Sequence, residues 1–225
     1  MEKEYRYELK YVISKQVADQ LKKQLRLVMP LDSHSVSEEY SYRIRSLYFD
    51  NPLNAAYYEK INGDEFRKKY RMRIYNDDPS FMRMECKHKD GNWTYKDDAP
   101  ISLEEAKKIL KNDPKLKFEN EFLRDFLIEK KALGLRPSVI VDYTRLAFVY
   151  PVSNVRITFD EELRSGRFKK DILDPELNTV PVYPDGQMVL EVKCDRFIPE
   201  HILKILGSYP FMREAVSKFV MCKGV

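Results

Sequence analysis

The sequence predicts an α+β fold in which an antiparallel β-barrel is flanked by helices. Several segments alternate charged and apolar side chains with a period of two, which is typical of strands that have one wet face. Other segments have apolar residues at helical spacing and begin with capping residues. The chain has 225 residues, 43% of them hydrophobic, and only 7 glycines. This composition predicts one packed domain spanning residues 1–225.

The strand pattern places charged side chains on one face and apolar side chains on the other. Five segments show it, at residues 5–11, 67–75, 82–89, 155–160 and 188–194. A sixth segment, 139–145, is mostly apolar and ends with Tyr143 and Arg145 on one face. Each segment is long enough to cross a sheet, and together they predict an antiparallel arrangement.

Basic residues recur along the charged faces more often than an ordinary wet face requires. The segment 67–75 places Arg71 and Arg73 on the same face as Arg67 and Lys69. Like charges on neighbouring strands repel each other, so we interpret their accumulation as a binding surface for an anionic ligand. The apolar faces are available for helices, and the charged faces are therefore expected to point into the barrel.

Helices are expected in five places, and three of them carry clear end signals. Ser14 is predicted to cap a helix that extends to about Val28. Ser102 and Glu105 form a capping box, and Gly134 follows a helical pattern over residues 121–133. The C-terminal segment predicts two short helices, at residues 199–206 and 211–220.

Several classes of function are disfavoured by the sequence. The 40 basic and 36 acidic residues leave a net charge of +4, too small to indicate nucleic-acid binding by itself. The three cysteines and three histidines lack the spacing of zinc ligands, and the chain has no P-loop motif. No apolar run could span a bilayer and the N-terminus has no signal region, so we expect a cytoplasmic protein without a membrane segment.

Eight short motifs, in a fixed order, carry a resemblance to a known family. They are RYELKY at 6–11, SLYFDN at 46–51, KYRMRIY at 69–75, ECK at 85–87, YTRLAF at 143–148, RITFD at 156–160, VLEVK at 189–193 and SKF at 217–219. The sequence resembles the polyphosphate polymerase domain of the vacuolar transporter chaperone (VTC) proteins. That family belongs to the CYTH-like superfamily of triphosphate tunnel metalloenzymes.

The resemblance implies a triphosphate tunnel fold, a barrel of about eight antiparallel strands. It also implies transfer of the γ-phosphate of ATP to a growing polyphosphate chain, with Mn²⁺ or Mg²⁺ as cofactor. The implied partners are ATP and polyphosphate or triphosphate. Arginine forks and lysine ammonium groups suit this chemistry, because phosphoryl transfer depends on positioning and on charge neutralisation.

The resemblance also implies the residues of the site. The catalytic residues would be Lys10, Arg71, Arg73, Lys87, Arg145 and Glu191. The other phosphate-binding residues would be Lys60, Lys96, Tyr143, Lys193 and Lys218. Glu191 would hold the metal, with Glu8 as a second candidate ligand that could instead be a counter-ion for the lysines. Lys60 is placed only by its spacing before the Arg71 and Arg73 pair.

One departure from the superfamily pattern affects the choice of activity. Many tunnel enzymes open with an ExExK strand, but Arg6 stands here where the first acid is expected. A two-metal site is therefore disfavoured, and the polymerase branch is favoured over the cyclase branch. The 225 residues contain neither an SPX domain nor a membrane helix, so control by inositol pyrophosphates and coupling to translocation are not implied.

Two functions other than the polymerase remain open, and a third is disfavoured. A tripolyphosphatase could use the same basic lining with water as the acceptor. A non-catalytic module could bind polyphosphate without turning it over. An RNA-binding sheet is disfavoured, because aromatic and arginine side chains fall on opposite strand faces and could not contact the same nucleotides.

Overall fold

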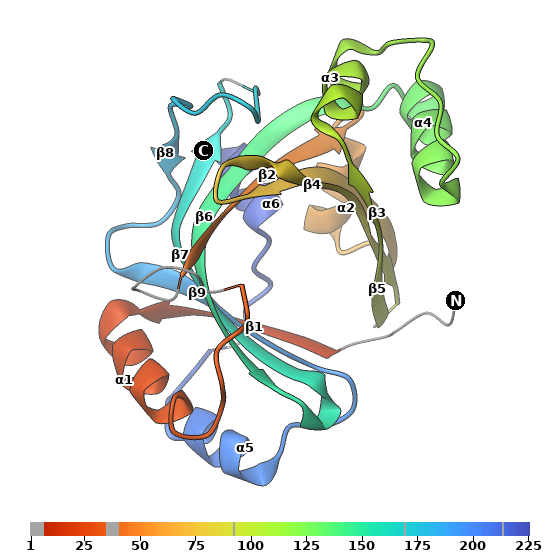
Figure 1. The fold of residues 1–225 in the computed structure, drawn as a ribbon. Helices are drawn as coiled ribbons and strands as arrows, with labels where there is room; N and C mark the ends of the chain where they lie inside the picture. Colours follow the sequence, from red (N-terminus) through yellow and green to blue (C-terminus); the bar gives the residue numbers. More distant parts are fainter. Residues whose placement is uncertain (1–6, 35–40, 92, 169, 213) are drawn as a thin grey trace. The chain divides into compact units, whose positions relative to one another are not determined.

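The computed structural model describes residues 7–34, 41–91, 93–168, 170–212 and 214–225, and these form strands and six helices (Figure 1). The paired strands whose registers are described are antiparallel, which confirms the α+β class. The chain divides into two compact units. Unit 1 comprises Met1–Arg43, Tyr143–Arg164 and Pro181–Ser217, and unit 2 comprises Ile44–Asp142, Ser165–Val180 and Lys218–Val225. A single domain over residues 1–225 stays a prediction.

Unit 1 is built on the edge strand β1 (Tyr7–Ser14), which pairs with β9 (Gln187–Cys194). Strand β9 in turn pairs with β7 (Val155–Gly166), which belongs to this unit up to Arg164. Strand β6 (Arg136–Tyr150) follows β7 in the sheet and belongs to this unit from Tyr143 on. The apolar strand faces and the helices α1 (Lys15–Leu25) and α5 (Glu200–Gly207) form one hydrophobic core. The opposite strand faces are consequently left to polar side chains.

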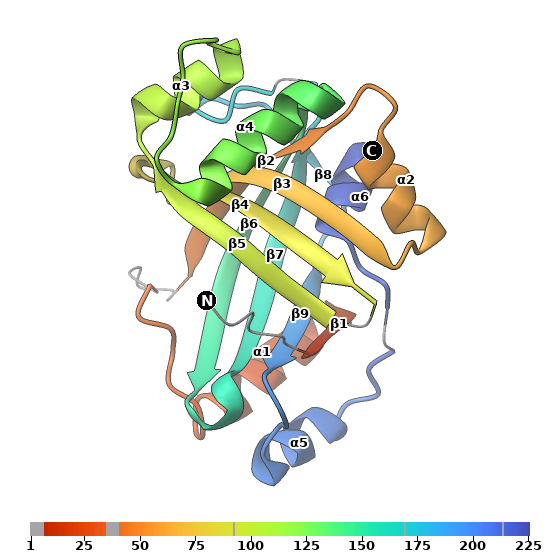
Figure 2. The same ribbon diagram turned by 90° about the vertical axis from the view of Figure 1, so that its right-hand side faces the viewer.

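Unit 2 contains four consecutive antiparallel strands. They are β2 (Tyr42–Asp50), which belongs to this unit from Ile44 on, β3 (Phe66–Tyr75), β4 (Asp78–Asp90) and β5 (Trp93–Ile101). Figure 2 shows α4 (Glu121–Leu133) lying across β3, β4 and β5. Phe126 of α4 is fully buried against Tyr70 and Phe49. The helix therefore covers the apolar strand face, and Arg71 and Arg73 of β3 and Glu85 and Lys87 of β4 lie on the other face.

Three shorter helices and two short elements complete the described chain. The helices are α2 (Ala55–Asn62), α3 (Leu103–Lys111) and α6 (Lys218–Gly224). The strand β8 (Val180–Pro181) pairs with β7, and the 3-10 helix η1 (Val152–Asn154) precedes β7. No helix in these described ranges has both the length and the hydropathy of a membrane span.

The hydrogen-bonded order of the strands ends at β1 and at β5, so within the described residues the sheet is not closed. The antiparallel architecture agrees with the prediction, and the described strands follow an order of eight, with the two-residue β8 paired to β7 as a ninth. Closure into a ring is not observed among these strands. Alternation of side chains indicates which strand face is wet. It carries no information on whether the first and last strands of a sheet pair with each other.

The predicted helix ends are largely confirmed. The Ser14 side chain accepts a hydrogen bond from the Val17 amide at 3.4 Å, and Ser102 and Glu105 form the reciprocal capping box. Gly134 ends α4 with a positive φ of 65°, a conformation that glycine adopts without a steric penalty. Local sequence determines these ends, because the caps bond within their own helix.

The last helix differs from its prediction, which placed it at residues 211–220. Helix α6 instead spans Lys218–Gly224. The Lys223 ammonium donates to Asp50, Asn54 and Ser138, each at 2.8 Å. These contacts come from distant parts of the sequence, so they hold the final turn in a way that local periodicity does not reveal.

Candidate functional site

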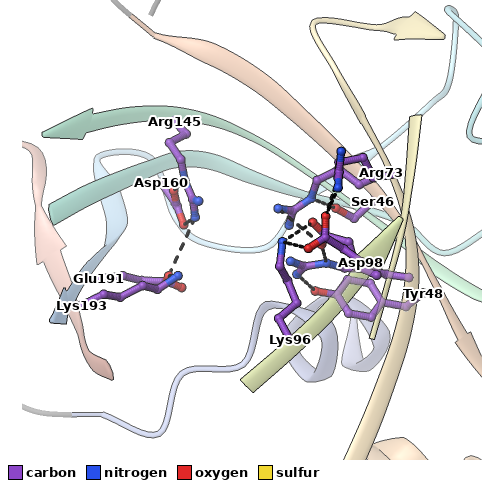
Figure 3. A network of polar contacts seen from close by, with 12 residues as sticks. Ser46, Tyr48, Arg73, Lys96, Asp98, Arg145, Asp160, Glu191 and Lys193 are labelled. Carbon is purple, nitrogen blue, oxygen red and sulfur yellow. Dashed lines mark hydrogen bonds and ion pairs between the residues drawn. The ribbon is translucent and has the colours of Figure 1, made fainter. Parts of the chain in front are cut away.

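Each unit has a cluster of basic side chains around one buried carboxylate (Figure 3). In unit 1, the Glu191 cluster consists of Lys10, Tyr143, Arg145, Asp160, Glu191 and Lys193. In unit 2, the Glu85 cluster consists of Ser46, Tyr48, Arg71, Arg73, Arg83, Glu85, Lys96 and Asp98. Both clusters lie on the charged strand faces that the sequence indicates.

The pairing of β1 with β9 creates the centre of the Glu191 cluster. Lys10 lies directly opposite Glu191, and Glu8 lies directly opposite Lys193. The Lys10 ammonium is 3.4 Å from one carboxylate oxygen of Glu191, and the Lys193 ammonium is 3.2 Å from the other. The Arg145 guanidinium is 3.9 Å from that second oxygen. Three cations therefore surround one carboxylate that is almost fully buried.

Arg145 contacts two neighbouring side chains, Asp160 and Tyr143. Its Nε and Nη2 groups donate to the two oxygens of Asp160 at 2.6 and 2.7 Å, a two-point ion pair. Its guanidinium also lies 5.3 Å from the centre of the Tyr143 ring, within cation–π range. Burial alone would lower the pKa of Arg145, but Asp160, Tyr143 and Glu191 together outweigh burial and raise that pKa well above its usual value.

The pKa of Lys193 is shifted in the opposite direction and lies below its usual value. Burial lowers the pKa of Lys193, and the nearby carboxylates Glu191 and Glu8 offset that effect only in part. The neighbouring cations Arg145 and Lys10 lower the pKa further. An additional anion beside Lys193 would therefore stabilise its charged form, which is the behaviour expected of an anion-binding lysine.

The pairing of β3 with β4 brings Arg71 directly opposite Glu85 in unit 2. Arg71 Nε is 2.5 Å from a Glu85 oxygen, Arg73 is 3.8 Å from the same oxygen, and Lys96 is 3.2 Å from the other. Only 2% of the Glu85 side chain is exposed. Burial alone would raise the pKa of Glu85, but these three cations outweigh it and hold that pKa well below its usual value.

Strand β2 supports the two arginines with residues that sequence reasoning did not assign. Ser46 lies opposite Arg73 and Tyr48 lies opposite Arg71. Arg71 donates to the Tyr48 hydroxyl at 2.8 Å, and Arg73 Nε donates to Ser46 Oγ at 3.0 Å. Ser46 and Tyr48 alternate with apolar residues in the SLYFDN motif, so period-two analysis could have placed them on the charged face.

Cations stand directly opposite one another across three strands of unit 2. Lys69 of β3 pairs with Lys87 of β4, and Lys87 pairs with Lys96 of β5. Arg73 pairs in the same way with Arg83. Directly opposed like charges destabilise a sheet, so this face is better suited to an anionic ligand than to water alone. Lys69 was not among the expected site residues, although its period-two position is the same as that of Arg71.

The structure groups most of the expected residues into two sets. Lys10, Tyr143, Arg145, Glu191 and Lys193 come together in unit 1, whereas Arg71, Arg73, Lys87 and Lys96 lie on neighbouring strands of unit 2. Lys60 lies in the last turn of α2, and Lys218 is the first residue of α6. Both come from helices. The roles of all these residues in binding phosphate or metal stay predictions.

Few carboxylates in these clusters could bind a divalent metal. Within the described ranges, no group of three or more His, Cys, Asp or Glu side chains could hold a metal ion. Glu191 offers a carboxylate, but lysine and arginine side chains contact both of its oxygens. These residues fit an ion that takes one protein carboxylate and completes its shell with phosphate oxygens, as Mg²⁺ commonly does.

Comparison with known proteins yields one family and a set of similar structures. The model of the VTC domain family matches residues 5–224. A putative adenylate cyclase from Bacillus halodurans aligns with a TM-score of 0.52 and 15% identity, covering 92% of this chain and 89% of its own. The PH1819 protein from Pyrococcus horikoshii aligns with a TM-score of 0.49 and 13% identity, covering 96% of this chain and 97% of its own. No curated protein matches the sequence significantly.

Proposed function

Because the chain belongs to the VTC domain family, we propose that it is a polyphosphate polymerase that transfers the γ-phosphate of ATP to a growing polyphosphate chain. Family membership and the CYTH-like tunnel fold support a function related to polyphosphate or triphosphate. The observation that carries the proposal is the pair of cation clusters, each built around a buried carboxylate on charged strand faces. We place this activity in the cytoplasm.

Both clusters suit a reaction that needs positioning and charge neutralisation. Arg71 and Arg73 are two residues apart on one strand face, so their guanidinium groups can contact different phosphate groups of one chain. The two-point contact with Asp160 fixes the orientation of Arg145, which lowers the entropic cost of using it as a phosphate ligand. The acceptor is a terminal phosphate that is already anionic, so the account requires no general base.

Glu191 is the residue that we propose as the ligand of a divalent Mn²⁺ or Mg²⁺ ion, with Glu8 as a second carboxylate. A metal bound there would neutralise charge on the phosphate oxygens. Lys10 and Lys193 already contact Glu191 and would then lie beside both the ion and the phosphates. The two lysines would thus stabilise bound ATP or polyphosphate when the Glu191 carboxylate binds the metal.

The proposal is tested by incubating the protein with ATP and Mn²⁺ and by separating the products on a gel. We expect long polyphosphate chains, together with ADP, and no chains when the metal is omitted. The matched control is Lys68→Ala, because Lys68 lies on the opposite face of β3 and pairs with Glu129 of α4. This variant should synthesise polyphosphate at nearly the normal rate.

Two other results would replace the proposal. Release of orthophosphate from tripolyphosphate, without chain growth from ATP, would identify a tripolyphosphatase. Tight binding of polyphosphate with no turnover at any Mn²⁺ or Mg²⁺ concentration would identify a binding module. The basic strand faces serve all three functions, so the products distinguish them.

A further inference from the structure

We propose that Glu85 competes with phosphate for the cations of the Glu85 cluster. Without ligand its carboxylate pairs with these cations, and when a phosphate binds, the carboxylate and the phosphate have to share them. The residue would thereby set the affinity and the selectivity of the cluster, favouring ligands that carry many linked charges. This inference rests on the proposed function only in requiring a linear polyphosphate ligand. It does not depend on which reaction follows binding.

The first support is the balance of charge in the cluster. Four basic side chains share two carboxylates, Glu85 and Asp98. The basic residues are Arg71, Arg73, Arg83 and Lys96. Glu85 contacts three of them, while Asp98 contacts Arg83 and Lys96. The cluster thus keeps excess positive charge, and Glu85 neutralises the part of it closest to the two arginines.

The second support is the position of Glu85 on a central strand. Strand β4 is paired on both sides, with Arg71 opposite Glu85 on β3 and Asp98 opposite Glu85 on β5. The backbone therefore cannot carry the carboxylate away from the cations when a ligand arrives. A bound phosphate must share Arg71 and Lys96 with Glu85, and two anions that share cations in a poorly solvated place repel each other.

The same geometry predicts that loss of the Glu85 charge destabilises the ligand-free protein and stabilises the complex with ligand. Without ligand, loss of the Glu85 charge leaves Arg71, Arg73 and Lys96 to repel one another, so the fold is weakened. With ligand, phosphate oxygens replace the lost charge, and the repulsion between ligand and carboxylate is absent. Glu85 and ligand are therefore coupled antagonistically, and a thermodynamic cycle can measure that coupling.

The test compares the unchanged protein with Glu85→Gln, which keeps the size of the side chain and removes its charge. Melting temperature is measured with and without tripolyphosphate, and the tripolyphosphate Kd is measured by calorimetry in the absence of ATP. We expect Glu85→Gln to melt lower without ligand, to gain a larger increase from tripolyphosphate, and to bind it at least about fivefold more tightly.

Asp142→Asn is the matched structural control. Asp142 is buried in the same unit and pairs with Arg45 Nε at 3.0 Å, and it belongs to neither cluster. This variant should also melt lower without ligand. Its increase in melting temperature with tripolyphosphate and its Kd should remain those of the unchanged protein.

Each other outcome has a definite meaning. Weaker binding of tripolyphosphate by Glu85→Gln would show that Glu85 orients Arg71 for the ligand. An equal Kd and an equal increase in melting temperature in both proteins would show that Glu85 has a structural role alone. Either result overturns the proposal. Failure of the unchanged protein to bind tripolyphosphate would instead count against the proposed function. If Glu85→Gln does not fold, Glu85→Asp is measured in the same way. The shorter side chain moves the carboxylate away from the cations, so the Kd and the melting temperatures should change in the same direction by a smaller amount.

Discussion

Replacing Arg71 or Arg73 by alanine is expected to weaken tripolyphosphate binding by about 100-fold. Each arginine lies on the charged face of β3 and donates a hydrogen bond to a side chain of β2, and each also contacts the Glu85 carboxylate. Loss of a charged partner in a largely desolvated place costs a few kcal/mol. The Arg71 change also leaves the Glu85 carboxylate less compensated, which adds repulsion toward the ligand.

Calorimetric titration with tripolyphosphate measures the effect directly. Lys68→Ala serves again as the control, because it removes a cation from the opposite face of the same strand. Its Kd should differ from that of the unchanged protein by less than about twofold. The assignment of this face as the binding surface is wrong if both arginine variants also stay within that limit while they remain folded.

The second large effect is expected for Glu191→Gln, which should reduce metal-dependent turnover of ATP to background. A neutral amide is a much weaker ligand for a hard divalent ion than a carboxylate. Glu191 also lies between Lys10 and Lys193, so the change should lower stability without preventing folding. The measurement is the turnover rate as a function of Mn²⁺ concentration, together with circular dichroism.

Glu161→Gln provides the control for that experiment. Glu161 lies on β7 in the same unit, and its carboxylate pairs with Lys22 of α1 instead of with the cluster. Its metal dependence should match that of the unchanged protein. Full turnover by Glu191→Gln at limiting metal would remove Glu191 from the metal site.

The strand faces were predictable because they follow from a local repeat. Alternation in β3 and β4 indicated that Arg71, Arg73 and Glu85 share one side, and the pairing of these strands confirms it. The structure also ends α4 at Gly134, as predicted. These features depend on backbone geometry within a few residues, which a single sequence displays directly.

Other features depend on contacts that local patterns do not display. Strand β5 carries the charged and turn-forming residues WTYKDDAPI, which hide its alternation, so Lys96 could not be aligned with Glu85 in advance. The central position of Glu85 follows from the registers of β3 with β4 and of β4 with β5. The position of α6 likewise depends on the distant partners of Lys223.

The central claim is that the basic strand faces hold a thin, linear chain of phosphates and are not a general surface for polyanions. Arg73 and Arg145 are more than nine-tenths buried, so a wide polyanion such as duplex DNA can reach only more exposed cations. Ion pairs formed with buried cations are screened less by salt than those at an open surface.

Melting temperature with tripolyphosphate, heparin or duplex DNA, at low and moderate salt, tests this claim most directly. Tripolyphosphate at about 100 times its Kd stabilises by about 2.7 kcal/mol, which corresponds to an increase of roughly 5–10 °C for a chain of this size. We predict that this increase persists at moderate salt and that heparin and DNA at matched charge produce much smaller ones. Equal increases from DNA and tripolyphosphate, both lost at moderate salt, would show an open basic surface and contradict the account.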